Sequence, residues 1–349
     1  MSRRTLTLLL ASVLALVLTG AAVAAPVPYV ALGPGPTFNT LGDVKIGKVT
    51  EPVITIEGRK TFPVDGHLEL TTVGVNPDLT LLQALRGWFD RDLAVVPRDV
   101  VYPPGRTDAQ VEAENAASMR QSQSSAALAA ARQLGFPIAR VTVKDFSPNS
   151  PAAGRLEAGD VLTTLDGTRL RDAADLRALV GGGQVGQIRR IGYLRRGAPG
   201  SVEVTTGLSG GDGEKRPVIG VLTAEEPVAL PFTVEISLEE VGGPSAGLMF
   251  ALGIVDKLDS VSLTAGKYIA GTGEITAEGT VGPIGGITQK LIAARAKGAV
   301  AFLVPAANCK EAALRPPAGL TLVKVSSLST ALDALAALRS GAAPASCTG

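Results

Sequence analysis

The sequence predicts an α+β fold that follows an N-terminal transmembrane helix, and three observations support this class. The chain has 349 residues and an ordinary globular composition, which is long enough for two or three domains. Residues 5–25 are apolar and uncharged, and as a helix they would reach about 30 Å, enough to cross a bilayer. Further along, stretches with the alternation of strands interleave with stretches that have helical spacing.

The N-terminal apolar segment has two interpretations. Two arginines precede it and no charge follows until Asp43, so the positive-inside rule places the N-terminus in the cytoplasm and the other domains outside. Ala22-Val23-Ala24 is typical of a signal-peptide cleavage site, which would give a secreted protein. The apolar length, and Pro26 just beyond the site, favour a permanent single-pass anchor over residues 1–28. Both interpretations export the bulk of the protein.

The net charge and the number of metal-ligating residues restrict the classes of partner and cofactor that are expected. The formal net charge is +1, so no overall field favours nucleic acid, and none is expected as a partner. The chain has a single histidine, His67, and neither cysteine has a metal-ligand neighbour, so no metal and no cofactor are expected. Whether Cys309 and Cys347 form a disulfide or remain two thiols is open, because sequence does not give their separation.

Residues 29–132 are predicted to form strands and helices that pack on a later domain. The Pro/Gly-rich segment 26–42 is typical of a linker or an extended edge. The elements expected after it are strands within 48–58 and 67–75, a helix over 79–96 with Leu79, Leu82, Leu85 and Phe89 at helical spacing, and one long or two short helices over 107–134. Gly135 is expected to end the last of these.

Residues 133–207 carry an ordered set of turns and strands. Ser150-Pro151-Ala152 is followed by Gly159-Asp160-Val161-Leu162, then by the Asp166-Gly167 turn and an amphipathic helix from Asp172. This order resembles a PDZ domain of the kind attached to bacterial envelope proteases. The resemblance implies a module that binds an extended peptide as an added strand. Residues 208–231 are interpreted as a linker and the first strand of the next domain.

The segment GGPSAG contains the G-x-S-x-G pattern over Gly243 to Gly247. Ser245 is therefore either an N-cap of the apolar helix that follows or a nucleophile. The only histidine lies far upstream, which excludes a Ser-His-Asp hydrolase in the usual chain order. If Ser245 is a nucleophile, its base is a lysine, a carboxylate or a free α-amine. A lysine base requires a dry position that lowers its pKa. Lys290 meets this best, because it lies in the first turn of a predicted helix beside an apolar stripe, where the helix dipole opposes its charge. Lys297 lies at the other end, where the dipole favours the cation.

Three ordered motifs resemble the Lon (S16) peptidases. They are GGPSAG, Thr272-Gly273-Glu274-Ile275-Thr276, and Gly282-Pro283-Ile284-Gly285-Gly286 followed by Lys290. The resemblance implies that Ser245 is the nucleophile, Lys290 the base and Thr272 a hydrogen-bond partner of the lysine. Gly243 would support the serine through its conformational freedom. The implied fold is a Lon-type proteolytic α/β domain over residues 232–345, with the PDZ-like module inserted into it or preceding it.

The combination resembles membrane-anchored, PDZ-containing Lon-like proteases of bacteria. The chain lacks the G-x-x-x-x-G-K-[ST] phosphate loop, so ATP-driven unfolding is not expected. The sequence thus predicts an ATP-independent serine endopeptidase of the cell envelope, acting on unfolded or PDZ-recruited protein and peptide substrates. The alternative is an inert PDZ-containing membrane scaffold or regulatory binding protein. Assembly into a homo-oligomer, substrate identity and cleavage specificity are left open.

Overall fold

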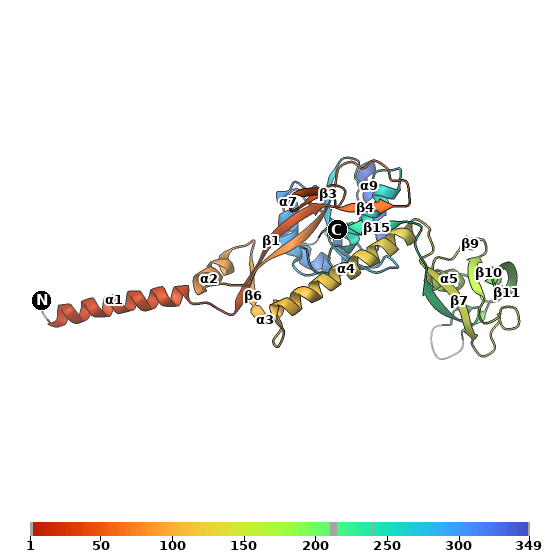
Figure 1. Ribbon diagram of the computed structural model, residues 1–349, viewed down its shortest axis with the longest axis horizontal. Coiled ribbons are helices and arrows are strands. Elements are labelled where there is room, and N and C mark those ends of the chain that lie inside the picture. Colours follow the sequence, from red (N-terminus) through yellow and green to blue (C-terminus); the bar gives the residue numbers. More distant parts are fainter. Residues whose placement is uncertain (1–2, 210–214, 239–240, 348–349) are drawn as a thin grey trace.

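The computed structural model describes residues 3–209, 215–238 and 241–347 (Figure 1). Residues 1–2 of the basic N-terminal segment, 210–214 of the predicted linker and 239–240 of the predicted strand before Ser245 lie outside the described residues. The molecule is elongated. Helix α1 projects from one end, the main body lies in the middle and a small β-rich domain forms the other end.

Helix α1 (Arg3–Ala24) is continuous, and its apolar window from Arg4 to Ala24 has none of its residues buried. By length and composition this helix is able to cross a membrane, and an N-terminal signal sequence would meet the same description. The structure therefore confirms an exposed apolar helix at this position and does not separate the two interpretations.

The main body is built on a six-stranded mixed sheet in the order β20-β19-β16-β5-β1-β6. The four strands from β20 to β5 are parallel, and β1 and β6 add antiparallel. Segment 26–42, interpreted as linker or edge, instead supplies the second strand from the edge, and the pairing shifts register between Pro34 and Thr37. The strands are β1 (Tyr29–Asn39), β5 (His67–Asn76), β6 (Ala94–Pro97), β16 (Tyr268–Gly271), β19 (Ala301–Pro305) and β20 (Thr321–Val325).

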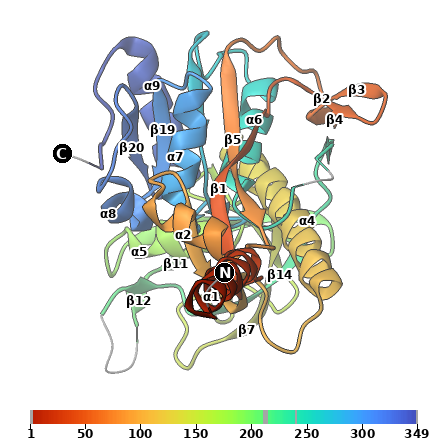
Figure 2. The same cartoon turned by 90° about the vertical axis from the view of Figure 1, so that its left-hand side faces the viewer.

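Helices cover both faces of this sheet (Figure 2). On one face, α7 (Ile287–Ala296) and α8 (Cys309–Ala312), which follows the short 3-10 helix η1 (Ala306–Asn308), enclose one apolar core. On the other face lie α6 (Gly247–Leu258), α4 (Asp108–Gln133) and α9 (Leu328–Ser340), which share the larger core. The predicted segment 107–134 is one helix, with a capping box at Thr107 and Gly135 in the left-handed conformation just after it.

Short two-stranded pairings complete the body and place its loops. β4 (Ile54–Glu57) pairs with β15 (Thr233–Ile236), so a segment that precedes the small domain hydrogen-bonds to one that follows it. The other pairs are β2 (Asp43–Ile46) with β3 (Val49–Pro52), β17 (Glu274–Ile275) with β18 (Val281–Gly282), and β12 (Gly207–Leu208) with β13 (Pro217–Val218).

The small domain has its own sheet and core. Its strands follow the order β11-β10-β8-β7-β14, with β9 on β8 and helix α5 (Ala173–Gly181) capped by Asp172. The strands are β7 (Ala139–Phe146), β8 (Val161–Leu165), β9 (Thr168–Arg169), β10 (Ile188–Arg195), β11 (Ala198–Thr205) and β14 (Val221–Pro227). Segment 208–231 was interpreted as linker and first strand of the next domain, but β14 pairs along the whole of β7 instead. The physical reason is burial, because Ile219 and Val221 pack into the small domain's core.

An ion-pair cluster joins the small domain to the end of α4. Arg132 contacts Asp172 and Asp175, and Arg171 donates three hydrogen bonds to Asp175, one from its backbone N–H and two from its guanidinium. Burial raises the pKa of Asp175, but the bonds from Arg171 and the charge of Arg132 outweigh it and leave the pKa below its ordinary value. These buried charges are paired, which is the usual condition for burying them.

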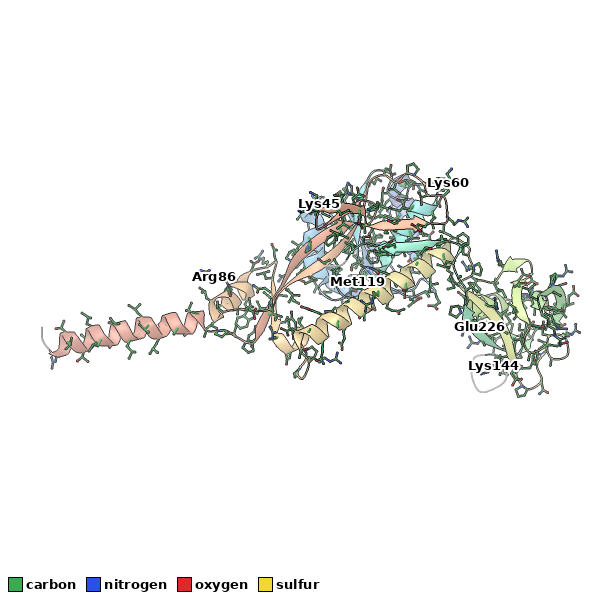
Figure 3. The ribbon with its side chains drawn as sticks, in the orientation of Figure 1. Lys45, Lys60, Arg86, Met119, Lys144 and Glu226 are labelled. Carbon is green, nitrogen blue, oxygen red and sulfur yellow. A yellow bond between two sulfur atoms is a disulfide. The ribbon has the colours of Figure 1, made fainter. Side chains whose placement is uncertain are left out.

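The predicted helix over 79–96 is shorter and lies differently from the expectation. Helix α2 (Leu81–Phe89) begins at a Thr80 capping box, and residues 94–97 form β6 and lead into α3 (Arg98–Val101). Arg86, labelled in Figure 3, marks α2 beside the end of α1. The residues at helical spacing do not share one environment: Leu79 is in a core, whereas Leu85 and Phe89 are exposed. Helical spacing identified the apolar face but not where that face points.

Candidate active site

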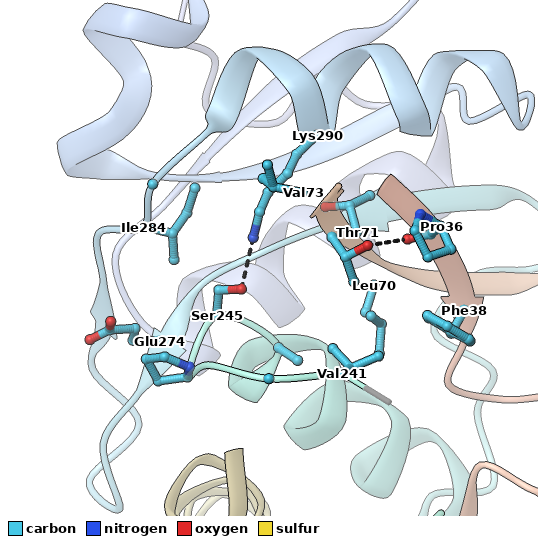
Figure 4. A pocket seen from close by; sticks show the side chains of 15 residues that line it. Pro36, Phe38, Leu70, Thr71, Val73, Val241, Ser245, Glu274, Ile284 and Lys290 are labelled. Carbon is cyan, nitrogen blue, oxygen red and sulfur yellow. Dashed lines mark hydrogen bonds between the residues drawn. The ribbon is translucent and has the colours of Figure 1, made fainter. Parts of the chain in front are cut away.

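Ser245 lies in the loop between β15 and α6, one residue before the N-cap of α6, which is Ala246. Ser245 therefore stands at the head of the helix, but it is not the N-cap and its side chain does not cap the helix. The Ser245 carbonyl accepts hydrogen bonds from the Gly273 N–H at 2.9 Å and from Thr272 Oγ1 at 3.0 Å. These bonds hold the Ser245 peptide unit, and its hydroxyl accepts a hydrogen bond from Lys290 on α7 (Figure 4).

The two glycines before Ser245 fit the loop tightly against α4. Gly243 has φ +84°, a left-handed conformation that favours glycine, and its N–H donates to the Asn115 carbonyl at 2.9 Å. A Cβ on Gly242 would lie 2.9 Å from Asn115 Cβ. Ser122, also on α4, donates its hydroxyl to the Pro244 carbonyl at 2.9 Å. The loop therefore rests on a helix that sequence reasoning did not connect with the site.

Lys290 lies in the first turns of α7 with its side chain turned into the protein, and the residue is only 2% exposed. Its Nζ donates to Ser245 Oγ at 2.7 Å and to Thr272 Oγ1 at 3.0 Å. Thr272 directly follows β16, so the strand end, the α6 loop and α7 meet at one point. The structure thus brings together the three polar residues that the sequence motifs had linked.

Lys290 is buried beside apolar side chains. Ile287, Leu291 and Ala294 on the same helix are fully buried, as the helical spacing predicted. Burial alone lowers the pKa of Lys290 from 10.5 to about 8, and no carboxylate of the described chain forms an ion pair with it. About a tenth of such lysines are neutral at pH 7, compared with fewer than about one in a thousand at the ordinary pKa. Lys297, at the end of α7, is exposed.

Gly286 explains why α7 begins where it does. It is the N-cap of α7 and has φ +67°, and a Cβ there would lie 2.6 Å from Val73 Cγ2 on β5. Both the backbone conformation and the lack of space require glycine. The helix start is consequently held against β5, which positions Lys290 one turn later over Thr272.

Ser245 and Lys290 line a cleft of about 400 Å³ (Figure 4). Apolar side chains form most of its wall, from β1, β5 and the loops before α6 and α7: Pro36, Phe38, Leu70, Val73, Val241 and Ile284. Thr71, Thr72 and Glu274 add polar groups. A cleft lined mainly by apolar side chains with a few polar groups beside a hydroxyl suits an apolar or mixed ligand.

Two backbone N–H groups of the Ser245 loop are available as donors for a developing negative charge. Within the described part of the chain, the N–H groups of Ser245 and Ala246 donate to no other backbone or side-chain acceptor. The start of α6 adds the positive end of its dipole. The Gly243 N–H is already used by Asn115, so it does not contribute.

Asn308 holds the cleft wall at Ile284 through two hydrogen bonds. No sequence pattern had pointed to this residue. Its Oδ1 accepts from the Ile284 N–H and its Nδ2 donates to the Ile284 carbonyl, each at 2.9 Å, and the residue is buried. The next residue, Cys309, forms a disulfide with Cys347, which resolves the alternative that the sequence left open. The disulfide ties the C-terminal segment to α8 behind this wall.

His67 stands apart from the site. It stacks on Tyr268 with ring centroids 4.2 Å apart, and its Nδ1 lies 3.8 Å from Glu69 Oε1. It does not line the cleft. Among the described residues, no group of histidine, cysteine, aspartate and glutamate side chains is arranged to hold a metal ion.

Comparisons with known proteins agree with both sequence resemblances. Residues 240–337 match the Lon protease (S16) C-terminal proteolytic domain, and residues 110–206 match the PDZ domain. The chain is 34% identical over 93 residues to Lon protease 2 of Bacillus subtilis, covering 27% of this chain and 16% of that protein. It is 40% identical over 93 residues to the Lon protease of Azospirillum brasilense, covering 26% and 11%. The chain thus spans less than a fifth of either relative.

The small domain also has similar solved structures. One is the PDZ domain of an SdrC-like protein from Listeria innocua, at 27% identity, covering 24% of this chain and 92% of that one, with a TM-score of 0.22.

Proposed function

Because the chain carries a Lon-type (S16) proteolytic domain beside a PDZ domain, we propose that it is a serine endopeptidase that works without ATP. Ser245 is the nucleophile and Lys290 the general base. The observation that carries this proposal is the 2.7 Å contact between Ser245 Oγ and a buried Lys290 Nζ whose pKa is lowered to about 8. A neutral amine at hydrogen-bonding distance is what a serine needs to lose its proton.

In the first step the neutral Lys290 amine takes the Ser245 hydroxyl proton as Oγ bonds to the carbonyl carbon of the scissile peptide. The carbonyl oxygen becomes an oxyanion that can accept hydrogen bonds from the Ser245 and Ala246 N–H groups. The Lys290 ammonium then gives its proton to the leaving amine, the C–N bond breaks and an ester to Ser245 remains. A water molecule, deprotonated by Lys290, attacks the ester, and the proton returns to Oγ as the acid product leaves.

Thr272 acts as a positioning residue in this proposal. Its hydroxyl donates to the Ser245 carbonyl and accepts from Lys290 Nζ, so it links nucleophile and base through one oxygen. Because Lys290 has no carboxylate partner, these two hydroxyl groups define where the flexible lysine side chain ends. Gly243 serves by shaping the loop, through the φ value and the Asn115 bond described above.

The PDZ domain would supply substrate. β14 is an edge strand of its sheet and lies beside the start of α5, where Glu225 Oε1 accepts from the Ala173 N–H at 2.7 Å. An extended peptide can pair with such an edge. β14 leads after five residues into β15 of the main body. We therefore expect unfolded proteins to be cleaved with a lower KM than short peptides that contain the same cleavage sequence.

The location in this proposal is the cell membrane, with α1 as a single-pass anchor and both globular parts outside the cytoplasm. The length and full exposure of α1 support it. If α1 were a cleaved signal segment, the mature protein would lack it, and the N-terminal sequence of the purified native protein distinguishes the two.

The deciding experiment measures cleavage of an unfolded, fluorescently quenched protein by the full chain without nucleotide. Ser245→Ala should lower kcat/KM by about 10³-fold or more. Ser260→Ala, an exposed serine just after α6, is the matched control and should keep full activity. His67→Ala should also remain active. If Ser245→Ala is as active as the control, the peptidase proposal is wrong. If neither the unmodified chain nor Ser260→Ala cleaves the substrate while peptides still bind the PDZ domain, the scaffold alternative is favoured.

A further inference from the structure

Helix α2 turns its largest apolar side chains toward solvent. Leu85 is 40% exposed, Trp88 52% and Phe89 88%, and they lie at i, i+3 and i+4 on one helix face. In a water-soluble domain a stripe of this kind normally faces the core. Adjacent exposed aromatic and aliphatic side chains of this size mark an interaction surface. We call Leu85, Trp88 and Phe89 the α2 stripe.

The packing of α2 shows that this orientation is built into the fold. Its buried face consists of the two small residues Ala84 and Gly87. A Cβ on Gly87 would lie 2.6 Å from Val95 Cγ2 on β6, so the helix backbone lies directly on that strand. Tyr29 on β1 meets Trp88 edge-on with ring centroids 5.6 Å apart. The face with Ala84 and Gly87 is therefore packed against the sheet, and the α2 stripe on the other face is exposed to solvent.

The end of α1 is connected directly to the start of α2. The Leu81 N–H donates to the Ala25 carbonyl and the Val27 N–H to the Leu79 carbonyl, each at 2.9 Å. Pro26 and Thr80 form an isolated bridge between the same segments. Figures 1 and 2 show α2 beside the last turn of α1, at the end of the molecule opposite the PDZ domain. Where α1 leaves a bilayer, α2 is therefore held at that same level.

We propose that the α2 stripe inserts into the lipid headgroup and upper acyl region of the membrane that α1 crosses. The occupant is lipid because the start of α2, the helix that carries the stripe, is hydrogen-bonded to the end of an exposed apolar helix of about 30 Å, the thickness of the hydrocarbon core. Tryptophan and phenylalanine are the residues that favour this interfacial layer. The inference rests on the proposed membrane location of α1 and is independent of the peptidase chemistry.

This second contact would fix the orientation of the main body. A single helix leaves the body free to rotate about the residues that follow it, whereas α1 and α2 together would give the body two attachment points. Because the PDZ domain lies at the far end, it would be held away from the bilayer.

Trp88 is the only tryptophan in the chain, so its fluorescence reports on this surface without labelling. The full chain is reconstituted into phosphatidylcholine vesicles and recovered by flotation. Lipids brominated near the carbonyl end of the acyl chain should then quench Trp88 emission, with a blue shift relative to detergent-free unfolded protein. The control is the double variant Trp88→Phe, Ile188→Trp, which moves the reporter to an exposed position in the PDZ domain. Its emission should be quenched by soluble acrylamide and not by brominated lipid.

Three results would overturn the inference in different ways. Floated protein whose Trp88 is quenched by acrylamide and not by brominated lipid would show that the stripe stays in water. Floated protein shielded from both quenchers would show that protein, such as a second copy, covers it. Failure to float would remove the membrane location itself, while cleavage of soluble substrate by the same sample would leave the peptidase proposal intact.

Discussion

Helices α2 and α7 are two short helices on the same sheet that depart from the usual distribution of polar and apolar residues in opposite directions. α7 buries a lysine among aliphatic side chains, and α2 exposes a tryptophan and a phenylalanine to solvent. Burying an amine destabilises its charged form, and exposing large apolar area forgoes hydrophobic stabilisation. In both helices the departure lies where a function is proposed, catalysis for α7 and membrane contact for α2.

The ion-pair cluster between α4 and the PDZ domain shows how a buried charge is held when it has a counter-ion. Asp175 is as buried as many core residues, yet it is matched by Arg132 and Arg171. Lys290 has two hydroxyl partners and no counter-charge. Burial with a counter-ion holds a charge in place, and burial without one releases a proton near neutral pH. The difference in partners, rather than burial as such, separates a structural charge from a candidate base.

The largest expected effect is at Lys290. Lys290→Met removes the base and fills the same volume with an apolar chain, so kcat/KM should fall about 10³-fold. Unfolding free energy should not fall, because a group whose charged form is disfavoured in the folded state has been removed. Lys297→Met, on the exposed end of α7, is the control and should be active. Steady-state kinetics with thermal denaturation test both, and an active Lys290→Met enzyme would rule out this base.

The next effect is the pH dependence of the native protein. With a pKa of about 8, the neutral fraction of Lys290 is about 1% at pH 6 and about 90% at pH 9, so kcat/KM should rise nearly a hundredfold over that range. The profile should level off above the pKa. A pH-independent rate between pH 6 and 8 would contradict a lysine base in this environment.

The same pKa shift predicts a stability change. The folded pKa lies below the unfolded value of 10.5, so the unfolded chain binds more protons between pH 8 and 10.5. The free energy of unfolding contributed by Lys290 should therefore increase with pH across that window. Denaturant unfolding of the native protein and of Lys290→Met at pH 7 and pH 10 isolates this contribution as the difference between them, and equal pH slopes would argue against the shift.

A smaller effect is expected at Asn308, which acts behind the cleft. Asn308→Ala leaves both Ile284 backbone groups without their partner and should lower the unfolding free energy by about 1–3 kcal/mol. The loss of kcat/KM should be mainly in KM, because Ile284 lines the cleft and does not touch the reacting atoms. Asn308→Asp keeps the acceptor for the Ile284 N–H and should retain more of both. A fall in kcat alone would indicate a different role.

The smallest stability effect is expected on the exposed face of α2. Leu85→Ala should change unfolding free energy by less than about 1 kcal/mol in detergent, whereas Leu291→Ala in the core beneath α7 should cost about 2–5 kcal/mol. Measuring the unfolding free energies of both variants in detergent and in vesicles shows whether the two helices differ in this way. If Leu85→Ala destabilises the detergent-solubilised protein as much as Leu291→Ala, the α2 stripe is part of a core rather than a surface for lipid.

Local sequence was sufficient for several elements and for naming the candidate reacting groups. The capping box at Thr107 begins α4, and the motif spacing linked Ser245, Thr272 and Lys290 before any geometry was known. The apolar stripe beside Lys290 indicated a dry environment, since helical periodicity reports directly on which face is buried. These are short-range or motif-level signals, carried by a few neighbouring residues each.

Long-range contacts decided the rest. The Asn115 and Ser122 bonds to the Ser245 loop span more than a hundred residues, and only the polar positions seven apart on an alanine-rich helix hinted at them. Asn308 gave no recognisable signal, because its role depends on where the loop at Ile284 arrives. Strand β14 belongs to the PDZ sheet through its pairing partner, which no local pattern specifies.

Sequence alone thus determined which groups are candidates for the proposed function: a serine, a lysine without a histidine, and an apolar N-terminal helix. Tertiary structure decided the direction in which those groups face. Ser245 could cap a helix or approach a base, and the α2 stripe could enter a core or meet solvent, with the same local periodicity in either case. Periodicity defines a face of a helix, but what that face meets depends on contacts between distant segments, and burial follows from those contacts.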